Sequence, residues 1–345
     1  MSYYFGVEIE LIAKPQDEQD LPRRAYYEKL AWSLNQRGLS AVADRLDGSR
    51  YCKHPEHYDK WWITKDGSLK DPSYPRIPLE AVSPTLRTGG GWEYEIDTFW
   101  YAWGHIFQKP DVSSLCGSHI HVSPFPRKAF SLYQLKHIAY GIIFYEPLIQ
   151  ELLPECRQHN KYCRKNTSCS AKLMSMGSGD GGELRDILNY IMGRIGDKQE
   201  LRDFMQESWG TRKDRYVLWN FDNILPDGSG SIEFRGGHGL RDPVATRMWI
   251  SFVVAFIHLC LEKDYFAIWR DSMSTFWTDL TKTARSLNVR QHLPSHWSDM
   301  MGFFSQDCYE EFFTDDDSSI MSKGDSEYKD SDHSDTNYRD YEDSY

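Results

Sequence analysis

Two glutamates near the start of the chain, Glu8 and Glu10, have a spacing that would let them act together. They alternate with Val7, Ile9 and Leu11, and this period of two is typical of a strand. Residues i and i+2 on a strand point to the same face, so the two carboxylates would lie side by side. Close carboxylates raise each other's pKa unless a cation lies between them, and Mg²⁺ suits both. The alternative is a solvated strand face.

Three more side chains that can bind a metal occur on two other expected strands. Glu80 lies within the apolar segment 78–82, where an acid either faces solvent or has a partner in a site. His119 and His121 alternate within 118–123, so they would share a face. Such a pair can bind one metal ion, line a polar cleft or fill a structural role.

A fourth strand carries an acid and a base together. Glu233 and Arg235 fall on one face of 231–235, with Ile232 and Phe234 on the other. A carboxylate suits a metal ion, whereas the planar arginine fork suits a phosphate or a carboxylate. A surface salt bridge between the two is the simpler alternative. Taken together, the four strands could hold two or more Mg²⁺ ions against a polyphosphate, with arginine neutralising the transferred phosphoryl group.

The elements that must position these side chains are predicted by periodicity and by turn residues. Strands are dispersed among helices rather than alternating with them strictly, which favours an α+β fold with a largely antiparallel sheet. The expected strands are 4–11, 60–64, 77–82, 118–123, 216–221 and 231–235, and the expected helices are 22–37, 92–107, 132–153, 183–209, 243–261 and 265–286.

Composition and charge bound the remaining choices. A chain of 345 residues with 40% hydrophobic and 14% aromatic residues can bury a large core. Of the net charge of −11, residues 314–345 carry −8, so the rest is nearly neutral and lacks the basic field of a nucleic-acid-binding protein. We expect one domain over 1–313 and an acidic tail over 314–345, too poor in aliphatic residues to fold.

The chain shows no pattern of an export signal, and its most apolar run, 249–261, is too short to cross a bilayer. We expect that run to be a buried helix. Seven cysteines, an odd number without an export signal, are expected to be reduced thiols. The sequence therefore predicts a cytoplasmic protein that binds neither membrane nor nucleic acid, and it leaves the oligomeric state open.

Five sequence blocks follow one another along the chain: FGVEIE at 5–10, DGSL at 66–69, LEAVSP at 79–84, CGSHIHVS at 116–123 and SIEFR at 231–235. In this order they resemble the amidoligase family, which is related to glutamine synthetase and glutamate–cysteine ligase. The resemblance spans about residues 3–262. The segment that contains Arg157, Asn160, Tyr162 and Cys163 also resembles the family segment R-x-x-N-x-Y-C, and Asn220 lies where an asparagine commonly precedes the last motif strand.

The resemblance implies a fold like that of glutamine synthetase, with a twisted, largely antiparallel sheet forming a funnel. ATP and Mg²⁺ would lie at one end and the acceptor carboxylate at the other. Arg235 would contact the γ-phosphate and then an acyl phosphate, while Arg157, Asn160 and Asn220 would help to bind nucleotide or substrate. Catalysis would rest on Arg235, Glu233 and Glu10. The implied metal ligands are Glu8, Glu10, Glu80, His119 and Glu233, with Asp66 either joining them or making a turn.

The implied activity is an ATP-dependent carboxylate–amine ligase that forms an amide through an acyl phosphate. Its substrates would be small molecules, amino acids or peptide-like acids and amines, and no side-chain nucleophile is needed. One departure concerns 236–242, where the family often has Gln-His and later Gly-Thr. This weakens any role for His238 and Arg241 and indicates an altered substrate pocket, while Trp249 is expected to lie in the core.

Alternatives remain at this stage. A hydrolase could bind Zn²⁺ or Fe²⁺ through His119, His121 and Glu233, although this leaves the other glutamates without a role. A relative that binds nucleotide without turnover would keep the same residues. The glycine-rich segment 174–182 lacks the Lys-Ser/Thr of a P-loop and is expected to be a mobile lid. A structural Zn²⁺ site or, more simply, free thiols would explain Cys156, His159, Cys163 and Cys169.

Overall fold

The computed structural model describes residues 2–17, 19, 21–44, 58–66, 69, 72–177, 183–208, 215–268 and 270–300. The described part lies within one compact unit. The predicted tail at 314–345 and the predicted lid beyond residue 177 lie outside the described residues.

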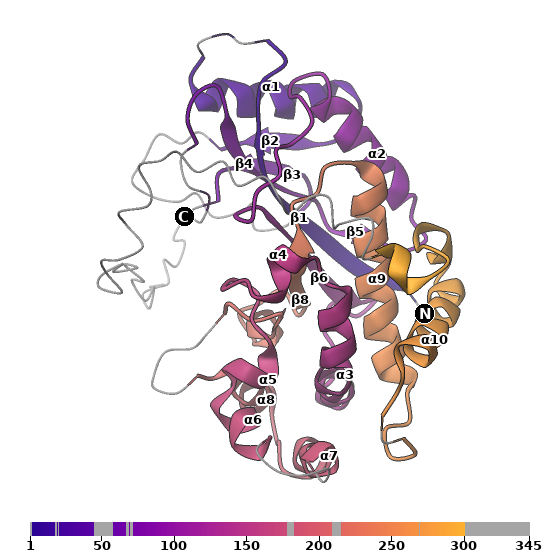
Figure 1. Cartoon of the computed structure of the whole chain (residues 1–345). Helices are drawn as coiled ribbons and strands as arrows, with labels where there is room; N and C mark the ends of the chain where they lie inside the picture. The colour runs from indigo at the N-terminus through magenta and orange to yellow at the C-terminus, as the bar shows by residue number, and fades with distance from the viewer. Residues whose placement is uncertain are drawn as a thin grey trace, which may run out of the picture. The chain divides into compact units, whose positions relative to one another are not determined.

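Its centre is an open, mixed sheet in which neighbouring strands are antiparallel, except that β2 and β3 are parallel (Figure 1). The long first strand β1 lies in the middle, between β4 and β6. Across the sheet the strands are β2 (Ala41–Ala43), β3 (Trp61–Thr64), β4 (Ile77–Val82), β1 (Tyr3–Ala13), β6 (Gly117–Pro124), β8 (Ile232–His238) and β7 (Trp219–Asn220), with β5 (Leu86–Arg87) paired to β1.

Strand register divides this sheet into an apolar and a polar face. In β1 the odd positions Val7, Ile9 and Leu11 are at most 1% exposed and belong to the core. The even positions carry Glu8 and Glu10 to the other face, as the alternation of a strand requires. Directly opposite residues share a face, so pairing extends the polar face across five strands. The register pairs are Glu10 with Glu80, Glu8 with His119, His121 with Glu233, and Asn220 with Glu233.

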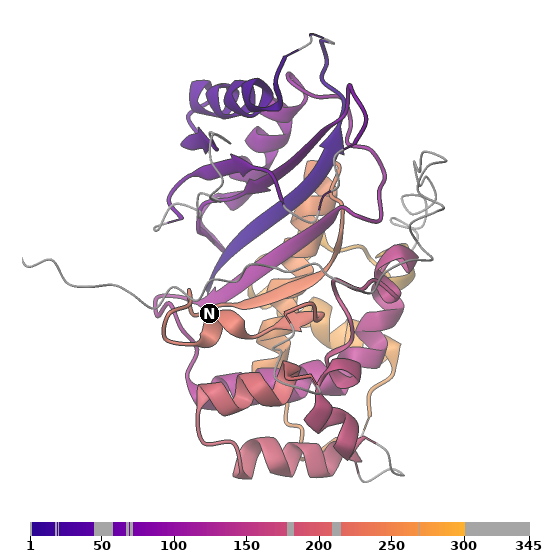
Figure 2. The same ribbon diagram turned by 90° about the vertical axis from the view of Figure 1, so that its left-hand side faces the viewer.

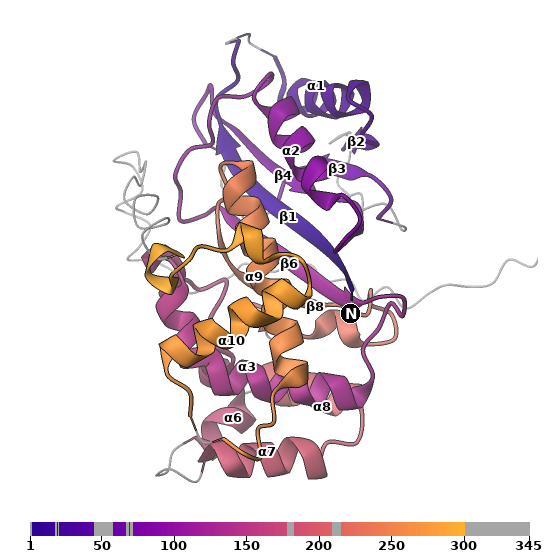
Figure 3. The same cartoon turned by 90° about the vertical axis from the view of Figure 1, so that its right-hand side faces the viewer.

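Helices cover the apolar face. Figure 3 shows α2, α9 and α10 in front of the sheet, and Figure 2, from the opposite side, shows the indigo β1 and magenta β6 in front of α9. The described helices are α1 (Arg23–Gln36), α2 (Trp92–Trp103), α3 (Leu132–Leu152), α4 (Glu155–Gln158), α5 (Asn166–Cys169), α6 (Ala171–Met176), α7 (Glu183–Gly193), α8 (Lys198–Gln206), α9 (Pro243–Glu262) and α10 (Met273–Ser286), with short 3₁₀ turns at Asp222–Ile224 and Arg290–His292.

Helix α9 is the central helix of the core. By length and composition alone it could cross a membrane, but 83% of its apolar window is buried inside the protein. It packs against β1 and β6, and Trp249 is fully buried, as predicted. Its start is fixed by Asp242, whose side chain accepts a hydrogen bond from the backbone N–H of Ala245. The prediction of a buried helix in this segment is confirmed.

Several predicted boundaries were wrong for local reasons. The expected helix 183–209 is two helices, α7 and α8, because Gly193 and Gly196 interrupt it and Asp197 caps a new helix that starts at Lys198, accepting from the N–H of Glu200. The last expected helix, 265–286, begins only at Met273, because Ser272 caps the helix at that point. Part of the expected lid, Met174–Met176, belongs to α6.

Candidate active site

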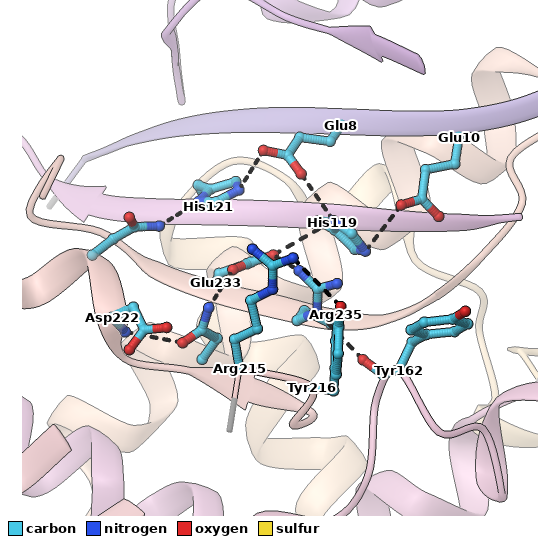
Figure 4. Close-up of polar contacts among 12 residues, drawn as sticks. Glu8, Glu10, His119, His121, Tyr162, Arg215, Tyr216, Asp222, Glu233 and Arg235 are labelled. Carbon is cyan, nitrogen blue, oxygen red and sulfur yellow. Dashed lines mark hydrogen bonds and ion pairs between the residues drawn. The ribbon is translucent and has the colours of Figure 1, made fainter. Parts of the chain in front are cut away.

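The polar face gathers most of the residues that the sequence singled out. Strands β1, β6 and β8 lie side by side, and their side chains converge as Figure 4 shows. His119, Glu10 and Glu233 are buried, whereas Glu8, Glu80 and His121 are partly exposed. The arrangement follows from alternation along each strand, since every one of these residues is flanked by core side chains.

Two histidines hold the two oxygens of Glu8. Nδ1 of His119 lies 2.8 Å from Oε2 of Glu8, and Nε2 of His121 lies 3.0 Å from Oε1. Burial acts to raise the pKa of Glu8, but the two histidines together hold it well below its usual range. Burial likewise acts to lower the pKa of His121, yet Glu8 raises it to about 9. Each group thus stabilises the charged form of the other, which favours a carboxylate at Glu8 beside a protonated His121.

The opposite end of the face has an excess of negative charge. Glu10 pairs directly with Glu80 across β1 and β4, and Asp66 lies close enough to act on both electrostatically. Burial raises the pKa of Glu10 and raises that of Glu80 well above its usual range, and neighbouring carboxylates raise both further. Carboxylates in such a position favour a cation between them.

Glu233 occupies the centre of the site, where it is held from several sides. Its Oε1 accepts from Nη1 of Arg235 and lies 3.5 Å from Nδ1 of His119, while its Oε2 accepts from Nδ2 of Asn220 at 2.8 Å. Burial acts to raise the pKa of Glu233, but Arg235 and the histidines lower it overall. Despite its own burial, Arg235 has a raised pKa because Glu233, Glu10 and Glu8 surround it.

Arg157 lies behind Arg235, 2% exposed. Its Nη2 donates to the backbone oxygen of Arg235 at 2.7 Å, and its guanidinium lies over Gly117 together with the carboxylate of Glu10. The backbone oxygen of Tyr162 accepts from Nε of Arg235 at 3.3 Å. The R-x-x-N-x-Y-C segment thus holds Arg235 in two ways, through the side chain of Arg157 and through the backbone oxygen of Tyr162.

The donor set fits a hard divalent cation. Among the described residues, Glu8, His121 and Glu233 offer ligand atoms that all lie within 4.8 Å of one another. Glu10 and Glu80, which pair directly across β1 and β4, add two further carboxylates beside them. Oxygen-rich sites of this kind suit Mg²⁺ or Mn²⁺. The predicted ligands all share this face, and His121, which the predicted set omitted, joins them.

Other predicted residues have structural contacts. Asn160 donates to the backbone oxygens of Ser114 and Cys156 and accepts from the N–H of Tyr162, so it organises its own loop. His238 is 4% exposed and accepts from Trp249. Burial, then the charges of Arg157 and Arg241, lower the pKa of His238 to about 3. Arg241 itself donates to the backbone oxygen of Pro110.

The alternative zinc site is not assembled within the described residues. Cys156, His159, Cys163 and Cys169 are not among the groups close enough to share an ion there. The thiol of Cys163 instead donates to the backbone oxygen of Arg157, and the described cysteines form no disulfide with one another. Their position favours the free-thiol interpretation.

Three residues that sequence reasoning missed lie behind the site. Gln206, Arg202 and Asp222 connect α8 to Asn220 and so to Glu233. No motif marks them, because the contact depends on how α8 packs. A glutamine or an arginine on a helix is usually exposed, and only their burial reveals them.

Comparison with known proteins identifies a family for this chain. A family model described as "putative amidoligase enzyme" matches residues 2–257. This range contains β1 to β8 and most of α9, and therefore every residue of the polar face. A search of curated proteins found no match.

Proposed function

Because the chain belongs to the putative amidoligase enzyme family, we propose that it is an ATP-dependent, Mg²⁺-requiring ligase that joins a carboxylate to an amine. The observation that supports this most strongly is the polar face itself. Four glutamates, two histidines and an arginine converge from β1, β4, β6 and β8 onto one side of the sheet. Such a set suits phosphoryl transfer, in which positioning and charge neutralisation are the main work of the protein.

In this proposal Glu8, Glu10, Glu80, His119 and Glu233 hold the metal, and His121 joins them. Bound Mg²⁺ would neutralise the phosphate oxygens of ATP and polarise the γ-phosphoryl group. Two or more ions are expected, since the carboxylates lie in two groups, one around Glu8 and Glu233 and one around Glu10 and Glu80. His121 then acts as a neutral ligand, because metal ligands must be deprotonated.

The arginines take the anionic substrate groups. Arg235 has its guanidinium at the edge of the carboxylate cluster, where it can bind the γ-phosphoryl oxygens through its planar fork. Arg157 supports it from behind through the hydrogen bond to its backbone oxygen. We assign Asn160 to the loop and Asn220 to Glu233, so neither contacts the nucleotide directly in this proposal.

The proposed reaction has two steps and needs no side-chain nucleophile. An oxygen of the substrate carboxylate attacks the γ-phosphorus, and the bond to the β–γ bridging oxygen breaks, releasing ADP. The amine nitrogen then attacks the acyl carbon, the acyl C–O bond breaks, and phosphate leaves. The amine gives its proton to water. Amino acids or small peptide-like molecules are the proposed substrates, in a funnel-shaped site like that of glutamine synthetase.

The test is ATP turnover by the purified protein. The protein is incubated with ATP, Mg²⁺ and pooled amino acids, and ADP and phosphate are measured beside Glu8→Gln and a matched surface variant, Glu28→Gln on α1. Amine-stimulated ADP formation that is lost in Glu8→Gln and kept in Glu28→Gln supports the ligase. ATP binding without any turnover would instead indicate an inactive nucleotide-binding relative.

A metal-dependent hydrolase is the second candidate, and one observation favours it. The described group within 4.8 Å, Glu8, His121 and Glu233, includes an imidazole, a ligand that suits Zn²⁺ or Fe²⁺. Elemental analysis of the purified protein distinguishes the two candidates. One tightly bound transition metal per chain, with neither binding nor use of ATP, would replace the ligase by the hydrolase.

A further inference from the structure

A buried chain of hydrogen bonds joins Glu233 to helix α8. Nδ2 of Asn220 donates to Oε2 of Glu233 at 2.8 Å, and Oδ1 of Asn220 accepts from Nε2 of Gln206 at 3.0 Å. Gln206 is fully buried, and Asn220 and Glu233 are at most 5% exposed. Polar groups this deeply buried are costly to leave unpaired, so their partners determine how they are oriented.

Two backbone N–H groups fix the orientation of both amides. The N–H of Phe221 donates to Oε1 of Gln206 at 2.7 Å, and the N–H of Asp222 donates to Oδ1 of Asn220 at 2.9 Å. Because an N–H can only donate, each contacted side-chain atom must be the amide oxygen. The NH₂ group of Gln206 is therefore directed to Asn220, and the NH₂ group of Asn220 to Glu233. If either amide were rotated by half a turn, its NH₂ group would face the backbone N–H that now donates to its oxygen, and two donors would oppose each other.

A partly buried ion pair between Arg202 and Asp222 anchors the far end of this chain. Oδ1 of Asp222 accepts from Nε2 of Gln206 at 3.0 Å and from Nε of Arg202 at 2.7 Å. Arg202 is 3% exposed and also donates to Asp203 at 3.0 Å. Arg202 and Gln206 are one turn apart on α8, so the same face of the helix supplies both.

We infer that Gln206, with Arg202 behind it, is a positioning residue that fixes Glu233 as a metal ligand through Asn220; this inference rests on the proposed function. The carboxylate of Glu233 accepts from Asn220 at one oxygen and from Arg235 at the other, so its plane is fixed toward Glu8 and His121. Residues that hydrogen-bond a metal ligand typically change metal affinity by about 10- to 100-fold when they are lost.

The test measures Mn²⁺ binding, without turnover, by titration of the full chain followed by electron paramagnetic resonance. Mn²⁺ prefers the same oxygen ligands as Mg²⁺. Gln206→Met removes all three hydrogen bonds of the amide, and Gln206→Glu keeps the acceptor for Phe221 while removing the donor to Asn220 and Asp222. Both are expected to bind Mn²⁺ about 10-fold more weakly. The matched control is Gln199→Met, an exposed glutamine on the same helix, which should bind like the wild type.

A double-mutant cycle separates positioning from general structural damage. If Gln206 acts through Asn220, then Gln206→Met causes no further loss of Mn²⁺ affinity in an Asn220→Ala background. Losses that multiply in the double variant would overturn the inference, as would wild-type affinity in both Gln206 variants. Either result leaves the proposed function standing. A wild-type chain that binds no Mn²⁺ would overturn the proposed function and the inference with it.

Discussion

Gly117 shows how tightly the site is packed at the scale of one residue. A Cβ atom at this position would lie 2.8 Å from Oε2 of Glu10 and 3.2 Å from Nη2 of Arg157. Glu10 and Arg157 are both buried, so neither side chain can move out into solvent. The absence of a side chain at Gly117 thus lets the Glu10 carboxylate approach the guanidinium group. The same residue lies in the CGSHIHVS block, where sequence reasoning emphasised only the histidines.

Gly117→Ala is expected to lower the rate of ADP formation by about 100-fold, because a displacement of about 1 Å in a positioned group costs that much. The rate is measured at saturating ATP and Mg²⁺. Gly104→Ala, at the end of α2, is the matched control, since a Cβ there has only ordinary contacts at 3.7 Å. Equal rates for the two variants would contradict the prediction.

His238 should make stability depend on pH. The pKa of this buried histidine is lowered to about 3, far below its value near 6.5 in an unfolded chain. Below pH 6.5 the proton therefore binds the unfolded chain and not the folded one. The stability that His238 contributes is present above pH 6.5 and declines toward pH 3 by about 1.4 kcal/mol per pH unit.

The measurement is the free energy of urea unfolding at pH 7 and pH 5.5 for wild type and His238→Gln, which keeps an acceptor for Trp249. The decline between the two pH values should be about 1 kcal/mol smaller in the variant. His159→Gln changes an exposed histidine and should keep the wild-type decline. A variant and a wild type with the same pH dependence would show that His238 titrates normally.

At the scale of elements, strands were predicted better than helix boundaries. The strands of the polar face carry alternating patterns, so β1, β4, β6 and β8 were all predicted from sequence to within a few residues. The short β2, β5 and α4 to α6 have too few residues to show a period. The division of 183–209 into α7 and α8 depends on capping by Asp197, a signal that a long amphipathic pattern obscures.

Helix α9 gives the prediction that belongs to this scale. Asp242→Ala removes the acceptor for the N–H of Ala245 and should lower the free energy of unfolding by about 1 kcal/mol. Urea unfolding measures this, and Mn²⁺ affinity should stay unchanged because α9 covers the apolar face. Asp186→Ala, at an exposed position within α7, is the control and should change stability by less than about 0.5 kcal/mol.

At the scale of the whole molecule, we expect Glu80 to lower the stability of the protein when no cation is bound. Burial, and then the charges of Glu8, Asp66 and Glu10, make ionisation of Glu80 costly and raise its pKa well above its usual range. Under the proposed function, a bound cation would remove this cost and add its own binding energy. Function and stability are therefore opposed at Glu80, as is usual for sites built from like charges.

Chelation should reveal this opposition. With EDTA, Glu80→Gln is expected to unfold at a higher temperature than the wild type, because it removes one of the repelling charges. With Mg²⁺ at about 100 times its dissociation constant, the wild type should gain about 2.7 kcal/mol and the variant less. Thermal unfolding in both buffers measures the effect, with Glu28→Gln as the neutral control. A lower unfolding temperature for Glu80→Gln in EDTA would contradict it.

The sequence predicted which side chains share the polar face better than it predicted their contacts. Alternation marked Glu8, Glu10, His119 and Glu233, and the family resemblance added Glu80 and implied that all five bind metal; register places the five on one face, while their role as ligands stays a prediction. That His121 lies beside Glu8 and Glu233 depends on strand order, which local patterns do not contain. The support from Gln206 depends on helix packing and could not be predicted from any motif.

Strand β1 lies in the middle of the sheet but precedes all of its partners in the chain. During synthesis at about 5–20 residues per second, on the order of tens of seconds separate Glu8 from Glu233. Once β4 and β6 have been made, β1 can pair with both while β8 does not yet exist. The nascent chain then bears Glu8, Glu10 and Glu80 without Arg235, and β8, the last strand to be made, brings Glu233 and the arginine together and joins β6 to β7.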